Sequence, residues 1–354
     1  MPCAAERAVG VPSKNGSCTE RRNAMSVSQD FESRTDRFRP ELLVHCYQML
    51  GSVHDAEDLV QETFLRAWRS YERFDGRRAA MRTWLYRIAT NACLTALETR
   101  SRRPLPSGLA APGEDPREPL AHGGEAPWLE PFPDTLLAGD RTDPESTFLA
   151  RGRLRLALVA AMQLLPARQR AVLILRDVLD WSAAEVAEVL DTTPAAVNSA
   201  LQRARARLGA VNVREDQVDE PTDRRHRALV DRYMAAFEDA DIAALARLLT
   251  EDAVLEMPPY LNWYIGRQRY TRFIERVFET RGTDWRMFPL SANGQPAVAA
   301  YVRDRDGFYH MHTLQVFTVT DNGISRNVTF PDASIFTLFG LKFTMEAPAA
   351  PASR

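Results

Sequence analysis

The sequence predicts a multidomain protein in which two all-α helical modules precede an α+β domain. Apolar residues recur with helical spacing in residues 31–103 and again in residues 147–209. The 43 residues between them, 104–146, contain nine prolines and five glycines, a composition typical of a linker. Residues 224–345 change from helical to strand-like patterns, with Asp306-Gly307 and Asn322-Gly323 as hairpin signals.

Composition excludes several classes of protein. The chain has 354 residues, 45% hydrophobic and 26% charged, which is ordinary for a soluble globular protein. No apolar run approaches the roughly 18–20 residues of a membrane span, and the start has no apolar signal core. We therefore expect a cytoplasmic protein that contacts no membrane. Four scattered cysteines exclude a disulfide scaffold and a zinc site, so we expect no metal and no cofactor.

Charge is distributed unevenly along the chain. Residues 81–103 carry five arginines against one glutamate, and residues 151–209 carry nine arginines against five acidic residues. Residues 104–146 carry two arginines against nine acidic residues. Two basic modules on either side of an acidic segment predict two contacts with a polyanion.

The remaining segments are expected to lie outside folded domains. Residues 1–30 lack periodicity and are predicted to be disordered, and Met25 is an alternative start. Residues 210–223 read as a second linker and residues 346–354 as a tail.

A helix is predicted over residues 56–68, with an acidic and polar face opposite its apolar stripe. The stripe contains Ala56, Leu59, Val60, Thr63, Phe64, Ala67 and Trp68. The opposite face presents Asp58, Gln61 and Glu62, which cannot bind DNA phosphate but can bind a basic protein surface. The alternative is an ordinary solvated face.

A second helix is predicted from about Thr83 to Arg100, and Pro104 ends it. It presents Trp84, Tyr86 and Arg87 near a basic end. Aromatic rings beside arginine can stack unpaired bases. The alternative is that Trp84 and Tyr86 are core residues.

Residues 181–208 predict a helix-turn-helix. Ser182 can cap the first helix, with Glu185 as its capping-box partner, and Asp191 lies in the turn. The second helix starts at Pro194 and has no acidic residue, which suits a helix in the major groove. Its outward face comprises Ala195, Asn198, Ser199, Gln202 and Arg205, with Arg203 on the flank. An ordinary helical hairpin is the alternative.

The linker contains one apolar island at residues 127–133. A free linker of 43 residues would stretch to about 140–155 Å. Yet Trp128, Leu129 and Phe132 lie close together in it. If they were exposed to water, the chain would lose the favourable free energy of burying their apolar surface. We predict that this island docks on the C-terminal domain, near the apolar residues of 330–341, as an intramolecular regulatory contact.

The two helical modules resemble extracytoplasmic-function (ECF) sigma factors. Residues 55–68 and 82–91 resemble sigma regions 2.2 to 2.4, and residues 165–205 resemble region 4. The resemblance implies a subunit that docks on the clamp and flap of the large subunit of core RNA polymerase, with Asp58, Gln61 and Glu62 at the clamp. It assigns two sets of residues to promoter DNA: Arg82, Trp84, Tyr86, Arg87 and Asn91 to the −10 element, and Ala195, Asn198, Ser199, Gln202, Arg203 and Arg205 to the −35 element.

Two positions depart from the region 4 pattern. Asp191 stands where a glycine is usual, and aspartate tolerates the left-handed conformation better than most residues. Ala200 follows Ser199 where arginine is common, so one phosphate contact is expected to be missing.

The C-terminal third resembles the SnoaL-like branch of the NTF2-like fold, on residues 235–242, 248–259 and 263–266. This arrangement is similar to sigma factors of the mycobacterial SigG and SigJ type, in which the extension is thought to regulate the sigma module. Residues 128–131 resemble their tryptophan-proline linker motif.

Six residues could line a pocket in this domain: Glu256, Tyr260, Trp263, His310, His312 and Asp332. His310 and His312 are spaced to share one strand face, so an acid–base pair is conceivable. We expect no catalysis, since fold does not imply chemistry, and leave open an unknown small ligand. Two other functions also remain open: a DNA-binding regulator that never joins polymerase, and an enzyme or ligand sensor whose helices are adaptors.

Overall fold

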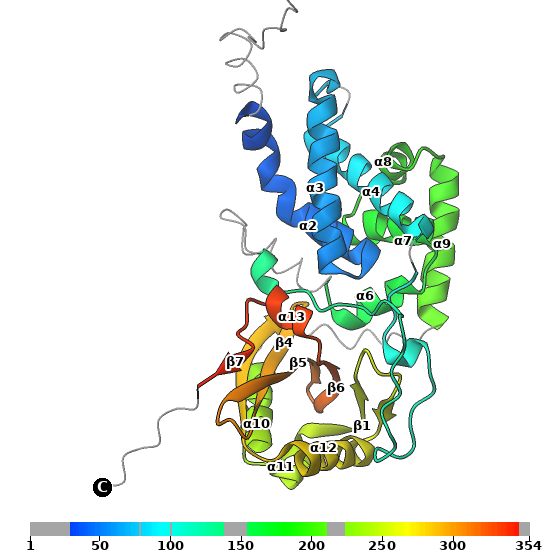
Figure 1. Cartoon of the computed structure of the whole chain (residues 1–354). Coiled ribbons are helices and arrows are strands. Elements are labelled where there is room, and N and C mark those ends of the chain that lie inside the picture. The colour runs from blue at the N-terminus through cyan, green and yellow to red at the C-terminus, as the bar shows by residue number, and fades with distance from the viewer. Residues whose placement is uncertain (1–28, 78, 100, 138–153, 211–223, 347–354) are drawn as a thin grey trace, which may run out of the picture.

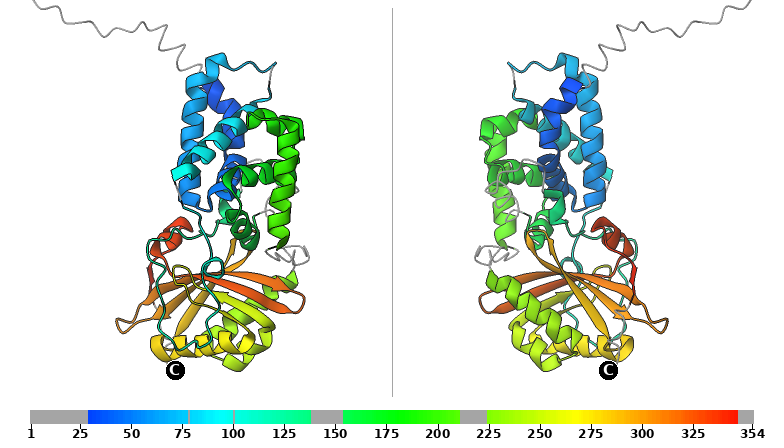
Figure 2. Two further views of the ribbon diagram at one scale, coloured as in Figure 1. Left: turned by 90° about the vertical axis from the view of Figure 1, so that its right-hand side faces the viewer. Right: turned by 90° about the vertical axis from the view of Figure 1, so that its left-hand side faces the viewer.

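The computed structural model describes residues 29–77, 79–99, 101–137, 154–210 and 224–346. The expected disordered start, second linker and tail lie almost wholly outside these residues. Two helical modules lie together at one end of the molecule and the sheet domain lies at the other (Figures 1 and 2). Within the described parts of the chain, no helix is both long and apolar enough to cross a membrane.

The first helical module packs α2, α3 and α4 around a shared core. Its elements are η1 (Asp36–Phe38), α2 (Arg39–Leu50), α3 (Val53–Ser70), η2 (Tyr71–Arg73) and α4 (Met81–Thr99). The Ser52 hydroxyl caps α3 by accepting a hydrogen bond from the Asp55 amide at 3.1 Å. Leu42, Val60 and Leu85 are almost fully buried, one from each helix. The apolar spacing therefore predicted the buried face of α3, except at its far end.

The second helical module contains the predicted helix-turn-helix. Its elements are α6 (Leu156–Gln163), α7 (Ala167–Leu173), η5 (Ile174–Val178), α8 (Ala183–Val189) and α9 (Pro194–Ala210). Ser182 and Glu185 form the expected capping box. Asp191 adopts a φ of 51°, so the turn does use the left-handed conformation. Val197, Leu201 and Ala204 are buried against the neighbouring helices, as predicted.

The two helical modules share one continuous core. The Gln163 amide of α6 donates to the Gln48 carbonyl of α2 at 3.2 Å. The Arg170 guanidinium of α7 is buried and donates to the carbonyl of Met49 and to Oε1 of Gln163. Burial lowers the pKa of Arg170 to about 10. The second module is therefore fixed to α2 by buried polar contacts as well as by apolar packing.

The C-terminal domain is a mixed sheet with helices on both faces. Its elements are α10 (Arg224–Glu238), α11 (Ile242–Leu248), β1 (Leu249–Glu256), β2 (Trp263–Ile265), α12 (Arg267–Arg281), β3 (Trp285–Ala292), β4 (Gln295–Arg303), β5 (Tyr309–Thr320), β6 (Gly323–Phe330), α13 (Ala333–Leu338) and β7 (Thr344–Met345). The strand order is β2-β1-β6-β5-β4-β3, with β7 on β5. β1 and β6 pair in parallel, and the other pairs are antiparallel.

Alternate residues along the strands enter two different cores. Phe317, Val298 and Trp285 pack under α10, α11 and α12. Val316 and Ala297 point to the opposite face, which α13 covers and which joins the core of the helical modules. Figure 2 shows this face turned toward the helices. The C-terminal domain is thus packed directly on the helical modules.

Strands β1, β2 and β3 were not predicted, because their apolar runs are short or interrupted. The Asn293-Gly294 dipeptide between β3 and β4 is the same hairpin signal as the two that were recognised, and it was overlooked.

The described part of the predicted linker 104–146, together with residues 101–103, is called the linker segment here (residues 101–137). It contacts the sheet domain along much of its length and not only at its apolar island. It includes η3 (Pro106–Gly108) and η4 (Asp134–Leu137) and runs down the sheet domain and back (Figure 1). The Gly113 and Gly123 amides donate to the carbonyls of Trp263 and Pro259, at 2.8 and 2.9 Å. The Trp263 indole donates to the Ala110 carbonyl at 2.8 Å. The backbone of this segment is irregular and cannot form all its hydrogen bonds internally. It forms them instead with residues along the edge made by β1 and β2.

Candidate functional site

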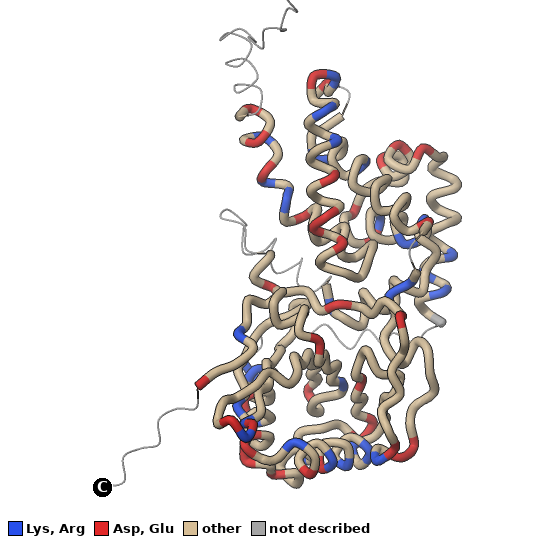
Figure 3. The backbone as a smooth tube through the Cα atoms, in the orientation of Figure 1, with Lys and Arg blue, Asp and Glu red and all other residues tan. Residues whose placement is uncertain are grey.

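The outward face of α3 is acidic and open to solvent. Asp58 and Gln61 are exposed, and Glu62 is half-buried in an ion pair with Arg66 one turn later, at 2.7 Å. Figure 3 shows acidic residues along this helix. Trp68, expected in the buried stripe, is 37% exposed and Leu65 is 50% exposed, because the end of α3 extends beyond the core. The exposed surface of α3 is therefore acidic along one side and apolar at its end.

The outward face of α9 is also exposed. The exposed residues are Ala195, Asn198, Ser199, Gln202, Arg203 and Arg205. Arginines lie along the second half of the helix (Figure 3). Arg205 is held by a bidentate ion pair with Asp177 of η5, at 2.8 and 2.9 Å, and these hydrogen bonds raise its pKa. From the amino end of α9 to its carboxyl end, this face presents small and amide side chains and then arginines.

The residues expected at the −10 element do not form one exposed surface. Arg87 and Asn91 are exposed on α4, whereas Trp84 is half-buried against the Phe74 ring at 4.7 Å. Tyr86 is fully buried, and its hydroxyl lies 3.3 Å from the Glu41 carboxylate. Arg82 makes an ion pair with the same carboxylate at 2.8 Å.

Trp181, at the start of the helix-turn-helix, covers two of these residues. Its ring lies 5.2 Å from the Tyr86 ring, and the Arg82 guanidinium lies 5.7 Å from the centre of the indole. Sequence reasoning did not single out Trp181, because nothing in its neighbourhood shows that it packs on another module. In this arrangement Tyr86 is not available to stack an unpaired base.

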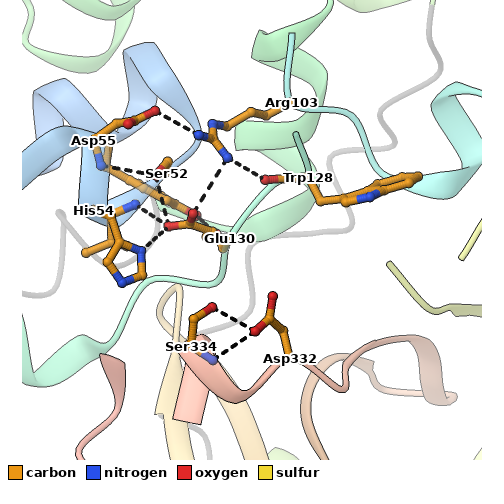
Figure 4. A network of polar contacts seen from close by, with 10 residues as sticks. Ser52, His54, Asp55, Arg103, Trp128, Glu130, Asp332 and Ser334 are labelled. Carbon is orange, nitrogen blue, oxygen red and sulfur yellow. Dashed lines mark hydrogen bonds and ion pairs between the residues drawn. The ribbon is translucent and has the colours of Figure 1, made fainter. Parts of the chain in front are cut away.

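Glu130 joins the linker segment to the first helical module (Figure 4). Its Oε2 accepts from the Val53 amide at 2.8 Å, from the Ser52 hydroxyl at 3.0 Å and from the His54 ring at 3.1 Å. The carboxylate therefore sits at the amino end of α3, where backbone N–H groups are unpaired. Arg103 completes the network by pairing with Asp55 at 2.8 Å and with Glu130 at 3.6 Å.

Phe132 joins the same segment to the C-terminal domain. Its backbone N–H donates to the side-chain Oδ1 of Asn293, and its carbonyl accepts from the backbone N–H of Asn293. Both distances are 2.8 Å. Phe132 is buried at this contact, whereas Leu129 is buried beside Gly51 of the first helical module. These hydrogen bonds place the docking site at the turn between β3 and β4, not at residues 330–341, although Ile335 and Phe336 lie in the same apolar core.

Trp128 differs from its two neighbours. Its ring is half-buried beside Gly123 of the linker segment, and its carbonyl accepts from Arg103 at 3.1 Å. Trp128 belongs to the island that was predicted to dock near residues 330–341, and its ring lies against the linker segment itself.

The six candidate pocket residues do not meet in one site. Glu256 is fully buried, paired with Arg326, and accepts the Ser107 amide of the linker segment at 3.0 Å. A β-bulge separates the two histidines: His310 pairs with Asp306 at 2.7 Å, and His312 packs on Trp285. Burial lowers the pKa of His312 to about 4.

The other three candidates have structural partners. Tyr260 and Trp263 contact the linker segment, and Asp332 caps α13 by accepting from Ser334 at 2.8 and 2.9 Å (Figure 4). The expected histidine pair on one strand face is therefore not formed.

Comparison with known proteins identifies each part of the chain. Residues 35–103 match the family described as Sigma-70 region 2, residues 155–208 match Sigma-70, region 4, and residues 230–327 match the SnoaL-like domain. The ECF RNA polymerase sigma factor SigG of Mycobacterium tuberculosis is 49% identical over 315 residues, which cover 88% of this chain and 84% of that protein.

SigJ of the same organism is 29% identical over 257 residues, 71% of this chain and 74% of that protein. The crystal structure of SigJ matches with a TM-score of 0.61 at 25% identity, covering 88% of this chain and 99% of that one. The order of the two helical modules and the SnoaL-like domain is thus shared with these relatives. The chain belongs to the ECF RNA polymerase sigma factors whose helical regions 2 and 4 are followed by a SnoaL-like domain.

Proposed function

We propose that this chain binds core RNA polymerase and directs it to promoters with separate −10 and −35 elements. The observation that carries the proposal is the exposed face of α9, presented by a capped helix-turn-helix in a member of the sigma factor family. Asn198 and Gln202 can pair with base edges in the major groove, and Arg203 can bind phosphate. Arg205 reaches phosphate when its pair with Asp177 opens.

The acidic side of α3 supports docking on polymerase. Asp58, Gln61 and Glu62 lie within about one turn of helix and face away from the core, so they can bind a basic protein surface. DNA phosphate would repel the two carboxylates. We assign this surface to the clamp of the large subunit.

The SnoaL-like domain acts on the helical modules in cis. The linker segment lies along the edge formed by β1 and β2, and its Ser107 amide donates a hydrogen bond to the Glu256 carboxylate. A regulatory role fits this arrangement better than catalysis, because Glu256 is committed to Arg326 and to the linker segment.

Genome-wide run-off transcription tests the proposal. Fragmented genomic DNA of the source organism is transcribed by core polymerase with and without the chain, and new RNA 5′ ends are sequenced. We expect 5′ ends that share two upstream elements and depend on the chain. If the chain binds DNA but starts no transcripts, it is a DNA-binding regulator that does not join polymerase, and the proposal is wrong.

A further inference from the structure

The turn between β3 and β4, together with the first residue of β4 (Asn293–Gln295, the junction turn), is buried by other parts of the chain. Asn293 is fully buried and Gln295 is 6% exposed. Asn293 has a φ of 55°, a left-handed conformation that asparagine tolerates. Hairpin tips are usually solvated, so a buried one is expected to have polar partners elsewhere.

Asn293 uses every polar atom of its side chain across domain boundaries. Its Oδ1 accepts from the Phe132 amide of the linker segment at 2.8 Å. Its Nδ2 donates to the Tyr47 hydroxyl of α2 at 2.9 Å and to the Leu154 carbonyl, next to α6, at 2.8 Å. One amide therefore ties both helical modules and the linker segment to the SnoaL-like domain.

The next two residues of the junction turn add two more ties. The Gly294 amide donates to the Asp134 carboxylate at 2.8 Å. Oε1 of Gln295 accepts from the Leu156 amide, at the amino end of α6, at 2.8 Å. Nε2 of Gln295 is fixed by its own sheet, because it donates to the Phe317 carbonyl and the Thr318 hydroxyl. The acceptor offered to α6 is therefore held in place by β5.

The second helical module, held in this way, lies over the DNA-reading helix α4. Trp181 packs on Tyr86 and under the Arg82 guanidinium, so the two residues expected to contact −10 DNA are covered. Within the second helical module, α7 and α8 both pack on α9. The module must therefore leave as a unit before α4 can receive unpaired bases.

We propose that the junction turn is a clasp that holds the second helical module on the DNA-reading face of α4 and so keeps the chain closed to −10 DNA. The junction turn offers two acceptors and two donors to main-chain groups at Phe132, Leu154 and Leu156. It donates two more hydrogen bonds to the side chains of Tyr47 and Asp134. The partner that it fits is this chain's own linker segment and the start of α6. The role in promoter access rests on the proposed function; the contact itself does not.

Hydrogen exchange of the full chain, without DNA or polymerase, tests the clasp. Asn293→Gly removes the side-chain amide and permits the left-handed backbone. Losing buried hydrogen bonds should speed exchange in residues 81–92 and 181–190 by about tenfold or more. Asn322→Gly is the matched control, because Asn322 lies in an exposed Asn-Gly turn of the same sheet. It should leave exchange in these peptides unchanged.

A second variant distinguishes loss of the clasp from unfolding of the sheet. Tyr47→Phe is nearly isosteric and removes the hydroxyl between Asn293 and the Glu130 carbonyl. It should speed exchange in the same peptides to a smaller extent, while β5 stays protected. If both variants leave residues 81–92 and 181–190 as protected as in the wild type, with β5 protected, the clasp is wrong.

Transcription separates the clasp from the proposed function. At limiting chain concentration, Asn293→Gly should raise the yield of chain-dependent transcripts several-fold, since more chains are open. A lower yield from a chain that opens by hydrogen exchange would show that the junction turn activates, and would overturn its inhibitory role. If neither wild type nor variant starts transcripts, the proposed function fails, and exchange alone decides whether the junction turn holds the modules together.

Discussion

The ring of Tyr86 on α4 lies 5.2 Å from the ring of Trp181, which precedes α8, and the planes are inclined by 59°. This contact joins a residue expected to read the −10 element with the start of the module expected to read the −35 element. On the proposed function, Tyr86 is closed to −10 DNA while these rings touch. The described arrangement is therefore a closed one, and its opening is a step that regulation can act on.

Reversing charge on α3 should weaken polymerase binding. The double substitution Asp58→Arg and Glu62→Arg changes exposed or half-exposed side chains, so the fold should persist. Replacing attraction by repulsion should weaken binding to core polymerase at least tenfold, measured by fluorescence anisotropy. The matched control is Glu251→Arg with Asp252→Arg on β1, which are exposed on the SnoaL-like domain. Equal affinities of the two double variants would remove α3 from the polymerase interface.

Removing cations from α9 should weaken DNA binding and flatten its salt dependence. Arg203→Ala with Arg205→Ala should lower the slope of log K against log salt by up to about one for each phosphate that the helix no longer binds. DNA fragments recovered in the run-off experiment serve as probes. Arg224→Ala with Arg232→Ala, exposed on α10, is the control pair. An unchanged slope in the α9 variant would mean that this helix does not lie along the phosphates.

Neutralising Glu130 should release the linker segment from the first helical module. Glu130→Gln loses the charge that caps α3 and pairs with Arg103, and hydrogen bonds to charged groups contribute about 1.5–3 kcal/mol. Unfolding by urea should show a loss of that order. Glu125→Gln, exposed in the same segment, should be silent. If Glu130→Gln leaves the free energy of unfolding unchanged, Leu129 and Phe132 alone hold the linker segment in place.

Truncating Trp128 tests whether the linker segment regulates through the SnoaL-like domain. Trp128→Ala removes the ring beside Gly123 and should alter transcription by the full chain, because the linker segment loses this contact between two of its own parts. In a chain that ends at residue 221 the same substitution should have no effect. The same effect in both chains would show that Trp128 serves polymerase or DNA instead.

Local patterns predicted local structure well. The Ser182–Glu185 capping box, the left-handed Asp191 and the buried faces of α3 and α9 all follow from interactions within a few residues. The docking of the linker segment was harder to predict. Its apolar island indicated a partner, but the partner's position depends on the Asn293 turn, more than 150 residues away. Tyr86 shows the same limit, since its cover comes from Trp181 in another module.

Acid should destabilise the first helical module through His45. Burial, helped by the nearby Arg82 cation, lowers the pKa of His45 from 6.5 to about 3. Below pH 6.5 the unfolded chain therefore binds a proton at His45 that the folded chain does not bind. The free energy of unfolding is unaffected by His45 above pH 6.5 and falls as the pH decreases below it. At pH 5 the loss is about 2 kcal/mol. His45→Gln can keep the contact with Thr90, which is 2.9 Å in the wild type, and should lose less stability between pH 7 and pH 5. Urea unfolding at the two pH values measures the difference, with His122→Gln in the exposed linker segment as control. Equal losses in wild type and His45→Gln would show that His45 takes up its proton without unfolding.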